Sequence, residues 1–406
     1  MRFMASSPAT PEGTGVLPAV VLGAGYAGLT VAQEVSRRSK GKIPIVLVDR
    51  NPVHVLRTEL YEVGKLASSG EDTDSWVVPL AEVLEGTSVS FRQGTVQSID
   101  LASRTVSIDA RQIRFRSLAI CLGSVAAYYG VPGAAEHTHQ VYRLSGAKKF
   151  AAAVRDIERA SVSLPGERRP RILIIGGGST GTELAAEVAT TDWRNIADPS
   201  ARPPDVFLLT GSLPFLSGFP PSLIERARAT LARSGVVIVP GLNVTRVEPC
   251  RVSLEDGSVL ACDAAVWCAG LEAPPVVAQL PVPHGKAGRV AAEETLEVPG
   301  HPGVFAVGDV VELRDPGTGL LVPSTAQAAL AEARTAARNL VARWKGTPLV
   351  PFLYKERGVV VALGLGQAAG SVRRVPIWGS PAALLKRIVQ RDYAHSVERG
   401  EPPTLI

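Results

Sequence analysis

Apolar runs alternate with amphipathic stretches along this chain, and the alternation predicts an α/β fold. An apolar run at 19–22 leads into a glycine turn, then into an amphipathic helix over 27–39 and a second apolar run at 44–51. Strand, helix and strand in this order form the βαβ unit of a parallel sheet. The same order returns over 171–212, so we expect two copies of one nucleotide-binding unit.

Polar and apolar residues alternate in other parts of the chain with the period of two that is typical of strands. The segments 89–108, 114–124 and 236–270 show this pattern, and we expect them to form small antiparallel sheets. The run from Val304 to Asp309 indicates a strand that returns to the first unit. The second unit is therefore expected as an insertion within the first.

These patterns predict two Rossmann-like dinucleotide-binding domains, the second inserted in the first, each with a small antiparallel sheet. The predicted first domain comprises 16–145 and 270–348, and the second comprises 146–269. Residues 1–15 lack the apolar core of a signal peptide and are expected to be a disordered lead-in. Residues 349–406 are expected to add strands and then a short basic helix.

The first glycine turn, Gly23-x-Gly25-x-x-Gly28, stands between a strand and a helix. Its first glycine permits the tight turn, the second lets a pyrophosphate approach the backbone, and the third lets the helix pack on the strand. The helix N-terminus offers amide donors to the phosphates. Asp49 ends the following strand, where a carboxylate can bind ribose hydroxyls. The register of these features predicts a bound dinucleotide.

The second turn, Gly176-x-Gly178-x-x-Gly181, has the same context and predicts a second dinucleotide. The acid expected after the following strand is absent, because Thr210 holds that position, and no arginine stands there for a 2′-phosphate. NADH and NADPH therefore both stay open. Two dinucleotide sites in one chain suit hydride transfer from a diffusing coenzyme to a bound carrier. A second unit that kept its fold and lost its ligand is the alternative.

Charge and composition narrow the function. The net charge is +5 with scattered Lys and Arg, which gives nucleic-acid binding no support. No run of 18 apolar residues exists, so we expect no membrane-spanning segment. The six histidines are scattered, and we expect no metal site. Cys121, Cys250, Cys262 and Cys268 lack CxxC spacing and are expected to be reduced and inert, in ordinary strand contexts, in a cytoplasmic protein.

Several separated motifs resemble those of the type II NADH dehydrogenases, a family of two-dinucleotide-binding flavoproteins with the pyridine nucleotide-disulfide oxidoreductase fold. The similarity extends from near Val20 to near Val397. An ordered set of motifs is more specific than one glycine turn. The motifs are VVLGAGYAGL, HVLRTELYEVG, ILIIGGGSTGTELAAE, AAVWCAG, GVFAVGDV, STAQAALAEA and YKERGVVVALG.

The resemblance implies non-covalent FAD on the first turn, NADH or NADPH on the second, and a quinone on the opposite side of the flavin. It implies Asp49 at the adenosine ribose, the Val96 backbone near the adenine, and Asp309 at the ribityl or pyrophosphate region. Thr58 and the strand end 121–124 would flank the flavin. The expected cofactor-binding residues are Gly23, Gly25, Tyr26, Ala27, Gly28, Asp49, Arg50, Thr58, Val96, Cys121, Gly123, Asp309, Ala326 and Gln327 for FAD, and Gly176, Gly178, Ser179, Thr180 and Gly181 for the coenzyme.

Glu183 and Gln327 are the candidate catalytic residues. Glu183 is expected in the first turn of the second unit's helix, where carboxylates also serve as ordinary dipole partners. Quinone reduction consumes protons, which a carboxylate beside the ring could relay. Ser324 and Thr325 are N-cap candidates for the helix that carries Gln327, and that helix would direct its positive end at the flavin. A solvated cap residue is the alternative for Gln327.

The chain departs from the family pattern in three places. Ala331 stands where the quinone-associated motif has a second glutamine, and Arg357 stands where a lysine is common. Thr210 stands where the coenzyme site has an acid. These departures leave the electron acceptor and the coenzyme preference open.

The basic tail segment 380–397 has two interpretations. Leu384 and Ile388 are expected toward one side, and Lys386 and Arg387 toward the other. Such a helix could lie on an anionic membrane surface; packing on its own subunit or on a partner subunit is the alternative. The resemblance implies a homodimer. We therefore expect a cytoplasmic protein with peripheral contact at the inner face of the cell membrane.

The leading hypothesis is a non-proton-pumping, FAD-dependent NAD(P)H:quinone oxidoreductase, with NAD(P)H and a quinone as partners. One alternative is a soluble NAD(P)H-dependent reductase of ferredoxin or another small acceptor. A sulfide:quinone oxidoreductase would rely on redox cysteines beside the flavin, and no cysteine follows Cys268. The alternative from another class is a flavoprotein used for binding.

Overall fold

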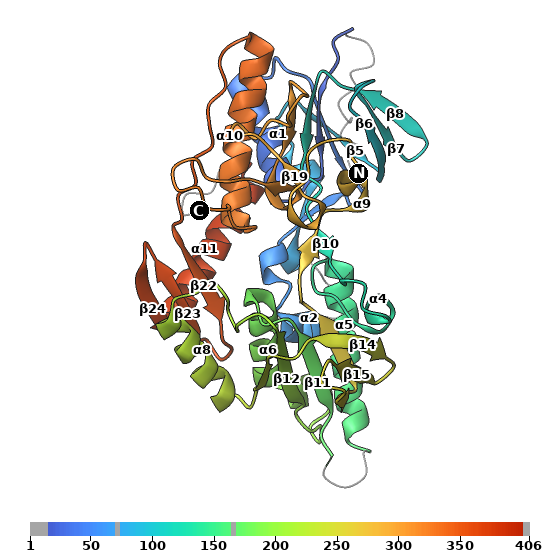
Figure 1. Cartoon of the computed structure of the whole chain (residues 1–406), viewed down its shortest axis with the longest axis vertical. Helices are drawn as coiled ribbons and strands as arrows, with labels where there is room; N and C mark the ends of the chain where they lie inside the picture. The colour runs from blue at the N-terminus through green and yellow to red at the C-terminus, as the bar shows by residue number, and fades with distance from the viewer. Residues whose placement is uncertain (1–14, 70–73, 164–167, 401–406) are drawn as a thin grey trace, which may run out of the picture.

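Two parallel sheets, one above the other in Figure 1, organise the chain. The structure is a computed structural model that describes residues 15–69, 74–163 and 168–400. The predicted lead-in over 1–15 thus lies outside the described residues, apart from Gly15. Across the described ranges, every helix is too short or too polar to traverse a lipid bilayer.

The upper sheet has five parallel strands in the order β20-β9-β1-β2-β5. Leu22 at the end of β1 pairs with Val48 of β2 and with Ile120 of β9. Helices α1 (Tyr26–Ser39) and α10 (Ala326–Lys345) pack against each other beside this sheet (Figure 1). The strands are β1 (Ala19–Leu22), β2 (Ile45–Asp49), β5 (Val89–Gln93), β9 (Ser117–Ile120) and β20 (Val304–Ala306).

The lower sheet has four parallel strands in the order β13-β12-β11-β17. Its central strand β11 is almost wholly buried and apolar, as expected for a parallel sheet covered on both faces. The strands are β11 (Arg171–Ile175), β12 (Asp205–Gly211), β13 (Val237–Pro240) and β17 (Ala264–Trp267). The helices α5 (Leu144–Ser161), α6 (Ser179–Thr190) and α8 (Pro221–Arg233) share a core with this sheet.

The second unit is inserted in the first, which confirms the predicted fold. The chain leaves the upper sheet after β9, builds the lower sheet, and returns at β20 beside β9. The outgoing and returning segments pair as β10 (Val125–Ala126) and β18 (Leu271–Glu272). Figure 1 shows β10 between the two sheets, so this pair marks the connection.

The antiparallel sheets are smaller than the sequence predicts. In the first unit β6, β7 and β8 form one, and in the second β14, β15 and β16 form the other. The predicted segments also included β5, β9, β13 and β17, which belong to the parallel sheets, so that part of the expectation is wrong. A short buried run has the same apolar character in either kind of sheet. The bounds are β6 (Val96–Asp100), β7 (Thr105–Ile108), β8 (Arg111–Arg114), β14 (Val244–Glu248), β15 (Arg251–Leu254) and β16 (Val259–Ala261).

The segment after β2 crosses from the upper unit to the lower one. Strands β3 (Val53–Val55) and β4 (Val77–Pro79) pair at its base. Helix α2 (Val63–Ser69) packs against α5 and α6, and Leu60 and Leu66 lie in the lower core. This segment therefore begins in the upper unit and reaches the core of the lower unit.

The C-terminal segment joins both units (Figure 1). Its antiparallel sheet packs against α11 (Ser380–Glu398), whose bounds agree with the helix expected over 380–397. Val361 lies in the lower core, whereas Tyr393 lies in the upper core. The sheet consists of β22 (Gly358–Ala362), β23 (Ala368–Val372) and β24 (Val375–Gly379).

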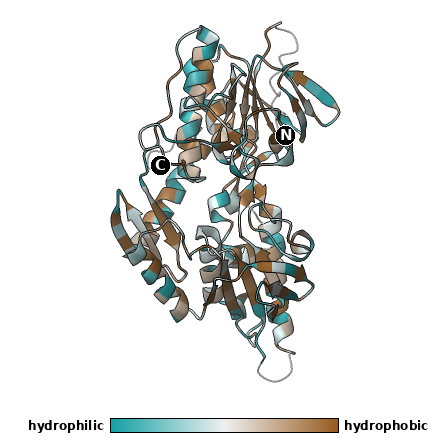
Figure 2. Ribbon diagram, viewed as in Figure 1, coloured by the Kyte–Doolittle hydropathy of each residue, from teal (hydrophilic) through white to brown (hydrophobic). Residues whose placement is uncertain are grey.

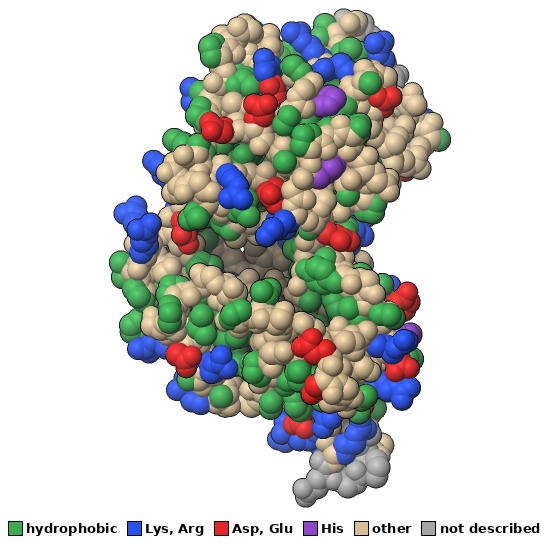
Figure 3. Space-filling view, viewed as in Figure 1, with side chains coloured by type: hydrophobic (Ala, Val, Ile, Leu, Met, Phe, Trp, Pro, Cys, Tyr) green, Lys and Arg blue, Asp and Glu red, His purple; other side chains and the backbone are tan. Residues whose placement is uncertain are grey.

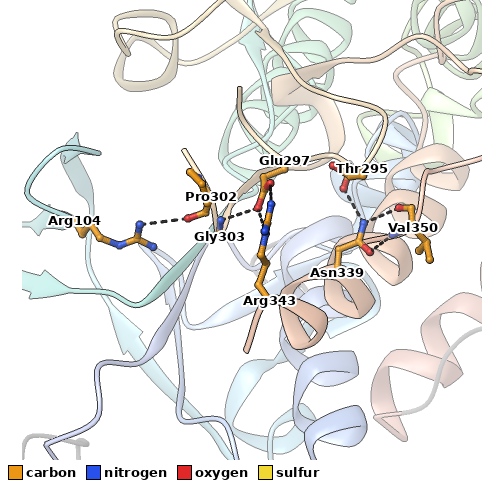
Figure 4. Close-up of polar contacts among 8 residues, drawn as sticks. All are labelled: Arg104, Thr295, Glu297, Pro302, Gly303, Asn339, Arg343 and Val350. Carbon is orange, nitrogen blue, oxygen red and sulfur yellow. Dashed lines mark hydrogen bonds and ion pairs between the residues drawn. The ribbon is translucent and has the colours of Figure 1, made fainter. Parts of the chain in front are cut away.

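Apolar residues concentrate in the strands of both sheets, and polar residues follow the outer helix faces (Figure 2). A polar cluster anchors the C-terminal half of α10 to the loop before β20 (Figure 4). Arg343 Nε lies 2.7 Å from Glu297 Oε1, which also accepts the Gly303 N–H at 2.7 Å. The remaining short α-helices and strands are α3 (Leu80–Val83), α4 (Ala134–His137), α7 (Trp193–Ile196), α9 (Pro275–Ala278), β19 (Val290–Ala291) and β21 (Val311–Glu312).

Candidate functional site

The first glycine turn is closed against the sheet and open toward a ligand. A Cβ on Gly28 would lie 1.8 Å from the Gly23 carbonyl oxygen, so only glycine lets α1 pack this closely. Gly23 has φ +96°, and a Cβ there would lie 2.3 Å from the Cys121 carbonyl oxygen. A Cβ on Gly25 would have no atom of the described chain within 4 Å. Gly25 is therefore where a pyrophosphate fits against the backbone.

The N-terminus of α1 is free to receive an anion. Gly25 is its N-cap and offers no side chain, and the first turn holds no acid. The unpaired amides and the helix dipole both attract phosphate. Asp49, at the end of β2, accepts hydrogen bonds from the backbone N–H groups of Ala24 and Asn51, each at 2.8 Å. The carboxylate thereby orders the turn at the ribose end of the expected dinucleotide.

The second glycine turn repeats this geometry. A Cβ on Gly181 would lie 2.0 Å from the Gly176 carbonyl oxygen, whereas a Cβ on Gly178 would have no described atom within 4 Å. Gly178 is the N-cap of α6, and the first turn again holds no acid. Glu183 is the fifth residue of α6, so it lies beyond the first turn, contrary to expectation. Dipole pairing at the helix terminus therefore does not account for this carboxylate.

Both turns open into one cavity of about 750 Å³. The surface is hollowed between the upper and lower halves of the molecule (Figure 3). Gly28, Gly176 and Gly181 do not line the cavity, because they form the backs of the two turns. Gly178 does not line it either, although a Cβ there would meet no described atom within 4 Å. The predicted residues that line it are Gly23, Gly25, Tyr26, Ala27, Asp49, Arg50, Thr58, Val96, Cys121, Gly123, Ser179, Thr180, Glu183, Asp309 and Ala326.

Three arginines line this cavity, together with the acids Asp49, Glu183 and Asp309. Arg50, Arg57 and Arg143 all line it. The Arg57 guanidinium lies 3.2 Å from the position of a Cβ on Gly123, at the strand end expected to flank the flavin. Burial lowers the pKa of Arg143, and the charges of Arg50 and Arg57 lower it further. These guanidinium groups are close enough to interact electrostatically, and their positive charges suit the pyrophosphates of two dinucleotides.

Two acids hold the turn after β20. Ser124 Oγ donates to Asp309 Oδ2 at 2.8 Å, and the Gly308 N–H donates to Glu332 Oε2 at 2.7 Å. Burial raises the pKa of Glu332 to about 8; the hydrogen bond from Gly308 opposes this shift, and the charge of Asp309 adds to it. The turn is thereby held with Asp309 in the cavity wall.

The N-terminus of α10 also faces the cavity. Thr325 is the N-cap, and its Oγ1 accepts the Ala328 N–H at 3.2 Å, which confirms Thr325 as the predicted cap. Ser324, Thr325 and Ala326 line the cavity. The positive end of the α10 dipole therefore points toward the expected flavin.

Gln327 does not line the cavity in this structure. Its Oε1 accepts the backbone N–H of Arg357 at 3.1 Å and the hydroxyl of Tyr354 at 3.4 Å. The side chain therefore holds the segment 354–357 against α10. A contact with an electron acceptor requires this side chain to turn.

Glu183 faces the cavity and is held by the C-terminal segment. Its Oε1 accepts the Ala362 N–H at 3.0 Å and forms an ion pair with Lys386 of α11. The Lys386 ammonium also lies 4.6 Å from the centre of the Tyr61 ring. Lys386 and Arg387 were expected on the same side of the tail helix, and that part of the expectation is wrong, because Lys386 lines the cavity whereas Arg387 is exposed. Helical spacing shows which residues share a face, not which face the fold covers.

Two further carboxyl groups lie near this ion pair. Burial raises the pKa of Glu59 to about 7; the charge of Glu62 adds to the shift, while the charges of Lys65 and Lys386 oppose it. Burial raises the pKa of Glu187 to about 7 as well, again with Glu62 adding. Neither carboxyl group lines the cavity, but groups that titrate near neutral pH close to such a site are candidates for proton transfer.

The first glycine turn is stacked on the C-terminal helix. The rings of Tyr26 and Tyr393 lie 4.5 Å apart with an angle of 12° between their planes. Burial lowers the pKa of His54 to about 4, so its ring is neutral. Nδ1 then donates to the Ala24 carbonyl at 2.8 Å, and Nε2 accepts from the Tyr393 hydroxyl at 2.9 Å. The Tyr26 hydroxyl bonds to Thr58 Oγ1 at 2.9 Å, which ties the turn to the crossing segment.

The four cysteines are all free thiols. Burial raises the pKa of Cys262 to about 11 and of Cys268 to about 12, and it raises that of Cys121 too. Cys250 is exposed in the turn between β14 and β15 with φ +60°, and Cys262 lies between β16 and β17, so neither is in a strand as predicted. Among the described residues, no three His, Cys, Asp or Glu side chains are grouped to hold a metal ion.

Sequence reasoning missed several residues of the cavity wall. Arg57 and Tyr61 flank Thr58 within the motif HVLRTELYEVG, so the motif itself could have identified them. Arg143 lies just before α5, and no pattern marked it. Lys386 reaches the cavity from the far end of the chain, which only the folded arrangement shows.

Comparison with known proteins identifies a family and several relatives of this chain. The family model of the pyridine nucleotide-disulphide oxidoreductases matches residues 18–333. Demethylphylloquinone reductase NdbB from a Synechocystis species is 29% identical over 382 residues, which cover 91% of this chain and 90% of that protein. A type II NADH:quinone oxidoreductase from Staphylococcus saprophyticus is 25% identical, over 91% of this chain and 93% of its own.

A solved structure supports the architecture. NDH2 from Plasmodium falciparum, in complex with NADH, superimposes with a TM-score of 0.82 at 14% identity, covering 96% of this chain and 99% of its own. At this identity the likeness shows the fold, and it matches the inserted pair of parallel sheets. The family match, together with the two glycine turns on one cavity, confirms the resemblance found in the motifs. The chain belongs to the pyridine nucleotide-disulphide oxidoreductase family.

Proposed function

We propose that this chain is an FAD-dependent NAD(P)H:quinone oxidoreductase of the type II NADH dehydrogenase kind, which does not pump protons. FAD, when bound, accepts a hydride from NAD(P)H and passes two electrons to a quinone. The names of the relatives, a demethylphylloquinone reductase and a type II NADH:quinone oxidoreductase, support a quinone as the acceptor.

One observation carries the proposal. The glycine turns of two separate parallel sheets open into the same cavity, with Gly25 on one side and Ser179 and Thr180 on the other. Hydride transfer requires the nicotinamide and the flavin ring in contact, and a shared cavity provides for it. The open backbone at Gly25 and at Gly178 fits a pyrophosphate in each turn.

The chain's own residues would then bind, orient and supply protons. We assign Glu183 as a proton donor toward the quinone, and Lys386 as the group that holds its carboxylate in place. Glu59 and Glu187 would pass protons toward it. Asp49 and Asp309 would hold the ribose and ribityl hydroxyls of FAD. We propose that the other cofactor-binding residues predicted from the sequence contact FAD or the coenzyme as the family resemblance implies.

Anaerobic stopped-flow spectroscopy tests the proposal. The purified protein should be yellow, its flavin absorption should bleach on mixing with NADH or NADPH, and menadione should restore it. If a ferredoxin reoxidises the reduced flavin while menadione does not, the chain is a reductase of a small protein acceptor. A colourless protein that takes up no FAD from solution contradicts the proposal altogether.

We propose that each of the two parallel sheets and its surrounding residues binds one of the two dinucleotides. We assign 16–145 with 270–348 to FAD, 146–269 to NAD(P)H, and 349–406 to the cavity wall and an outer interface. The crossing helix α2 belongs by sequence to the first of these and packs on the second. That packing supports a coupled pair of domains.

We further propose peripheral contact with the inner face of the cell membrane. Leu384 and Ile388 of α11 are exposed, and so are Arg387 and Arg391 beside them. Apolar and basic residues on one exposed helix face bind anionic lipid surfaces. Cosedimentation with anionic vesicles, and its absence with zwitterionic ones, is the expected result.

Sedimentation velocity tests the proposed homodimer.

A further inference from the structure

The adenosine end of the second dinucleotide site has an unusual arrangement. In a Rossmann unit, an acid that ends the second strand binds the coenzyme's ribose hydroxyls and disfavours a 2′-phosphate. Here that strand, β12, ends in Thr210 and Gly211, and neither carries a charge. Other groups at this position must therefore decide between NADH and NADPH.

Asn243 occupies the space beside the end of β12. Its Oδ1 accepts the backbone N–H of Ser212 at 3.0 Å. The same oxygen lies 2.9 Å from the position of a Cβ on Gly211, so the amide stands where a side chain at 211 would begin. The neighbouring Thr210 is 7% exposed, and its hydroxyl has no hydrogen-bond partner within the described residues. This hydroxyl oxygen is buried, and Thr210 presents no charged group at the strand end.

Glu255 holds Asn243 from the other side. Its Oε1 accepts the Asn243 backbone N–H at 3.1 Å, and its Oε2 accepts the side-chain amide at 3.0 Å. The Glu255 N–H returns a hydrogen bond to the Asn243 carbonyl at 3.0 Å. Glu255 is exposed in the turn between β15 and β16. The Glu255 carboxylate, which belongs to another hairpin, is thus held near the end of β12 by its hydrogen bonds to Asn243.

A basic side chain also approaches the loop after β12. The Arg228 guanidinium of α8 lies 5.6 Å from the centre of the Phe215 ring. Its Nε is 3.9 Å from Glu225 Oε1, so this charge already has an acidic neighbour. Arg228 is the competing candidate, because a guanidinium at this end would favour a 2′-phosphate.

We propose that Asn243 and Glu255 replace the missing acid and make the chain prefer NADH over NADPH, an inference that rests on the proposed function. The ribose hydroxyls meet the neutral edge of Thr210 and Asn243. A 2′-phosphate at the same place meets the negative charge of Glu255. Because Glu255 is exposed, salt screens this repulsion, and the preference weakens as ionic strength rises.

Two measurements on the FAD-loaded protein test the inference. The first follows anaerobic flavin reduction by NADH and by NADPH without any quinone. The second titrates ADP-ribose and 2′-phospho-ADP-ribose by calorimetry, which does not depend on turnover. Wild type should reduce its flavin with NADH about tenfold more efficiently than with NADPH, and the phosphorylated probe should bind more weakly.

Glu255→Gln is the informative variant, because it removes the charge and keeps one of the two oxygens that accept hydrogen bonds from Asn243. It should tighten binding of 2′-phospho-ADP-ribose by about fivefold at low salt and have little effect at high salt. Asp256→Asn is the matched control. That neighbouring exposed carboxylate bonds to Ser258, and its loss should leave the coenzyme ratio as in wild type.

Two results would overturn the inference. One is the same discrimination in Glu255→Gln as in wild type at every salt concentration. The other is efficient use of NADPH by wild type that Arg228→Gln abolishes, since the phosphate would then belong to Arg228. Failure of the proposed function looks different: the flavin is reduced with the expected preference for NADH, and no quinone reoxidises it.

Discussion

The ring of Tyr393 stacks on the ring of Tyr26, 4.5 Å between centres and nearly parallel. Tyr26 follows the open glycine of the first turn, and Tyr393 belongs to the last helix of the chain. The Tyr393 hydroxyl also bonds to His54, which in turn holds the Ala24 carbonyl inside the turn. The C-terminal segment therefore supports the turn that would hold the FAD pyrophosphate, in addition to lining the cavity with Lys386.

Replacing Tyr393 with leucine should loosen both the fold and the cofactor. Removing a stacked, buried aromatic ring costs about 3 kcal/mol of unfolding free energy. We expect a lower melting temperature and faster FAD release, measured by flavin fluorescence during heating and during dilution. Tyr393→Phe is the control, because it keeps the ring and loses the bond to His54, at about 1–2 kcal/mol. FAD release as slow in Tyr393→Leu as in wild type would show that the stack does not support the turn.

Alanine at Gly178 and at Gly181 should have different effects. At Gly181 the new methyl group would lie 2.0 Å from a backbone oxygen, so Gly181→Ala should destabilise the second unit. At Gly178 the methyl group meets open space that we assign to the coenzyme pyrophosphate. Gly178→Ala should therefore fold and retain FAD while KM for NADH rises about tenfold.

Thermal unfolding and steady-state kinetics distinguish these outcomes. An unchanged KM in a stable Gly178→Ala protein would place the coenzyme elsewhere. A stable Gly181→Ala protein would mean that α6 moves away from the turn more readily than its packing indicates.

The glycine turns were the most predictable part of the site, because their spacing alone dictates a backbone geometry. The closures at Gly28 and Gly181 and the open positions at Gly25 and Gly178 all follow from the motif. The inserted topology was predictable for a related reason, since a repeated βαβ pattern and a returning strand at Val304 leave one simple arrangement. Helix α10 and its Thr325 cap followed from local rules as well.

The contacts made by the C-terminal segment could not be predicted in this way. Lys386 reaches Glu183 across 203 positions of sequence, and Tyr393 reaches His54 across 339. Amphipathic spacing marks a helix face without naming its partner. The prediction that the alternating segments form antiparallel sheets was partly wrong for a different reason. Ser117–Ile120 is buried on both faces, and period-two alternation does not distinguish parallel from antiparallel pairing.

Glu183→Gln should separate the two half-reactions. The variant keeps an oxygen for the Ala362 N–H and loses the ionisable carboxylate. If Glu183 supplies a proton to the quinone, reoxidation of the reduced flavin should slow by about 10²-fold, with a smaller change in flavin reduction by NADH. Stopped-flow measurement of each half-reaction provides the comparison.

Variants of Lys386 complete this test. Lys386→Arg retains a cation beside Glu183 and should reoxidise faster than Lys386→Met, which leaves the buried carboxylate without its partner. The opposite pattern in Glu183→Gln, slow flavin reduction with normal reoxidation, would assign the carboxylate to nicotinamide placement instead.

Glu332→Gln should flatten the pH dependence of stability. Burial raises the pKa of Glu332 to about 8, from an ordinary value of 4.5, so between these pH values the native state binds a proton that the unfolded chain does not. The free energy of unfolding contributed by this group is therefore fully present below pH 4.5 and falls as pH rises through the native pKa, by up to about 1.4 kcal/mol per pH unit. Urea unfolding at saturating FAD, from acidic to mildly alkaline pH, measures the slope.

Glutamine keeps the oxygen that accepts the Gly308 N–H and removes only the titration. Glu59 and Glu187 have raised pKa values too and contribute slopes of the same sign, so wild type minus Glu332→Gln isolates the one group. Glu398→Gln, at an exposed position near the end of α11, should leave the wild-type slope intact. If wild type and Glu332→Gln lose stability in parallel as pH rises, Glu332 is already ionised in the native state, and its burial beside Asp309 is compensated by another group.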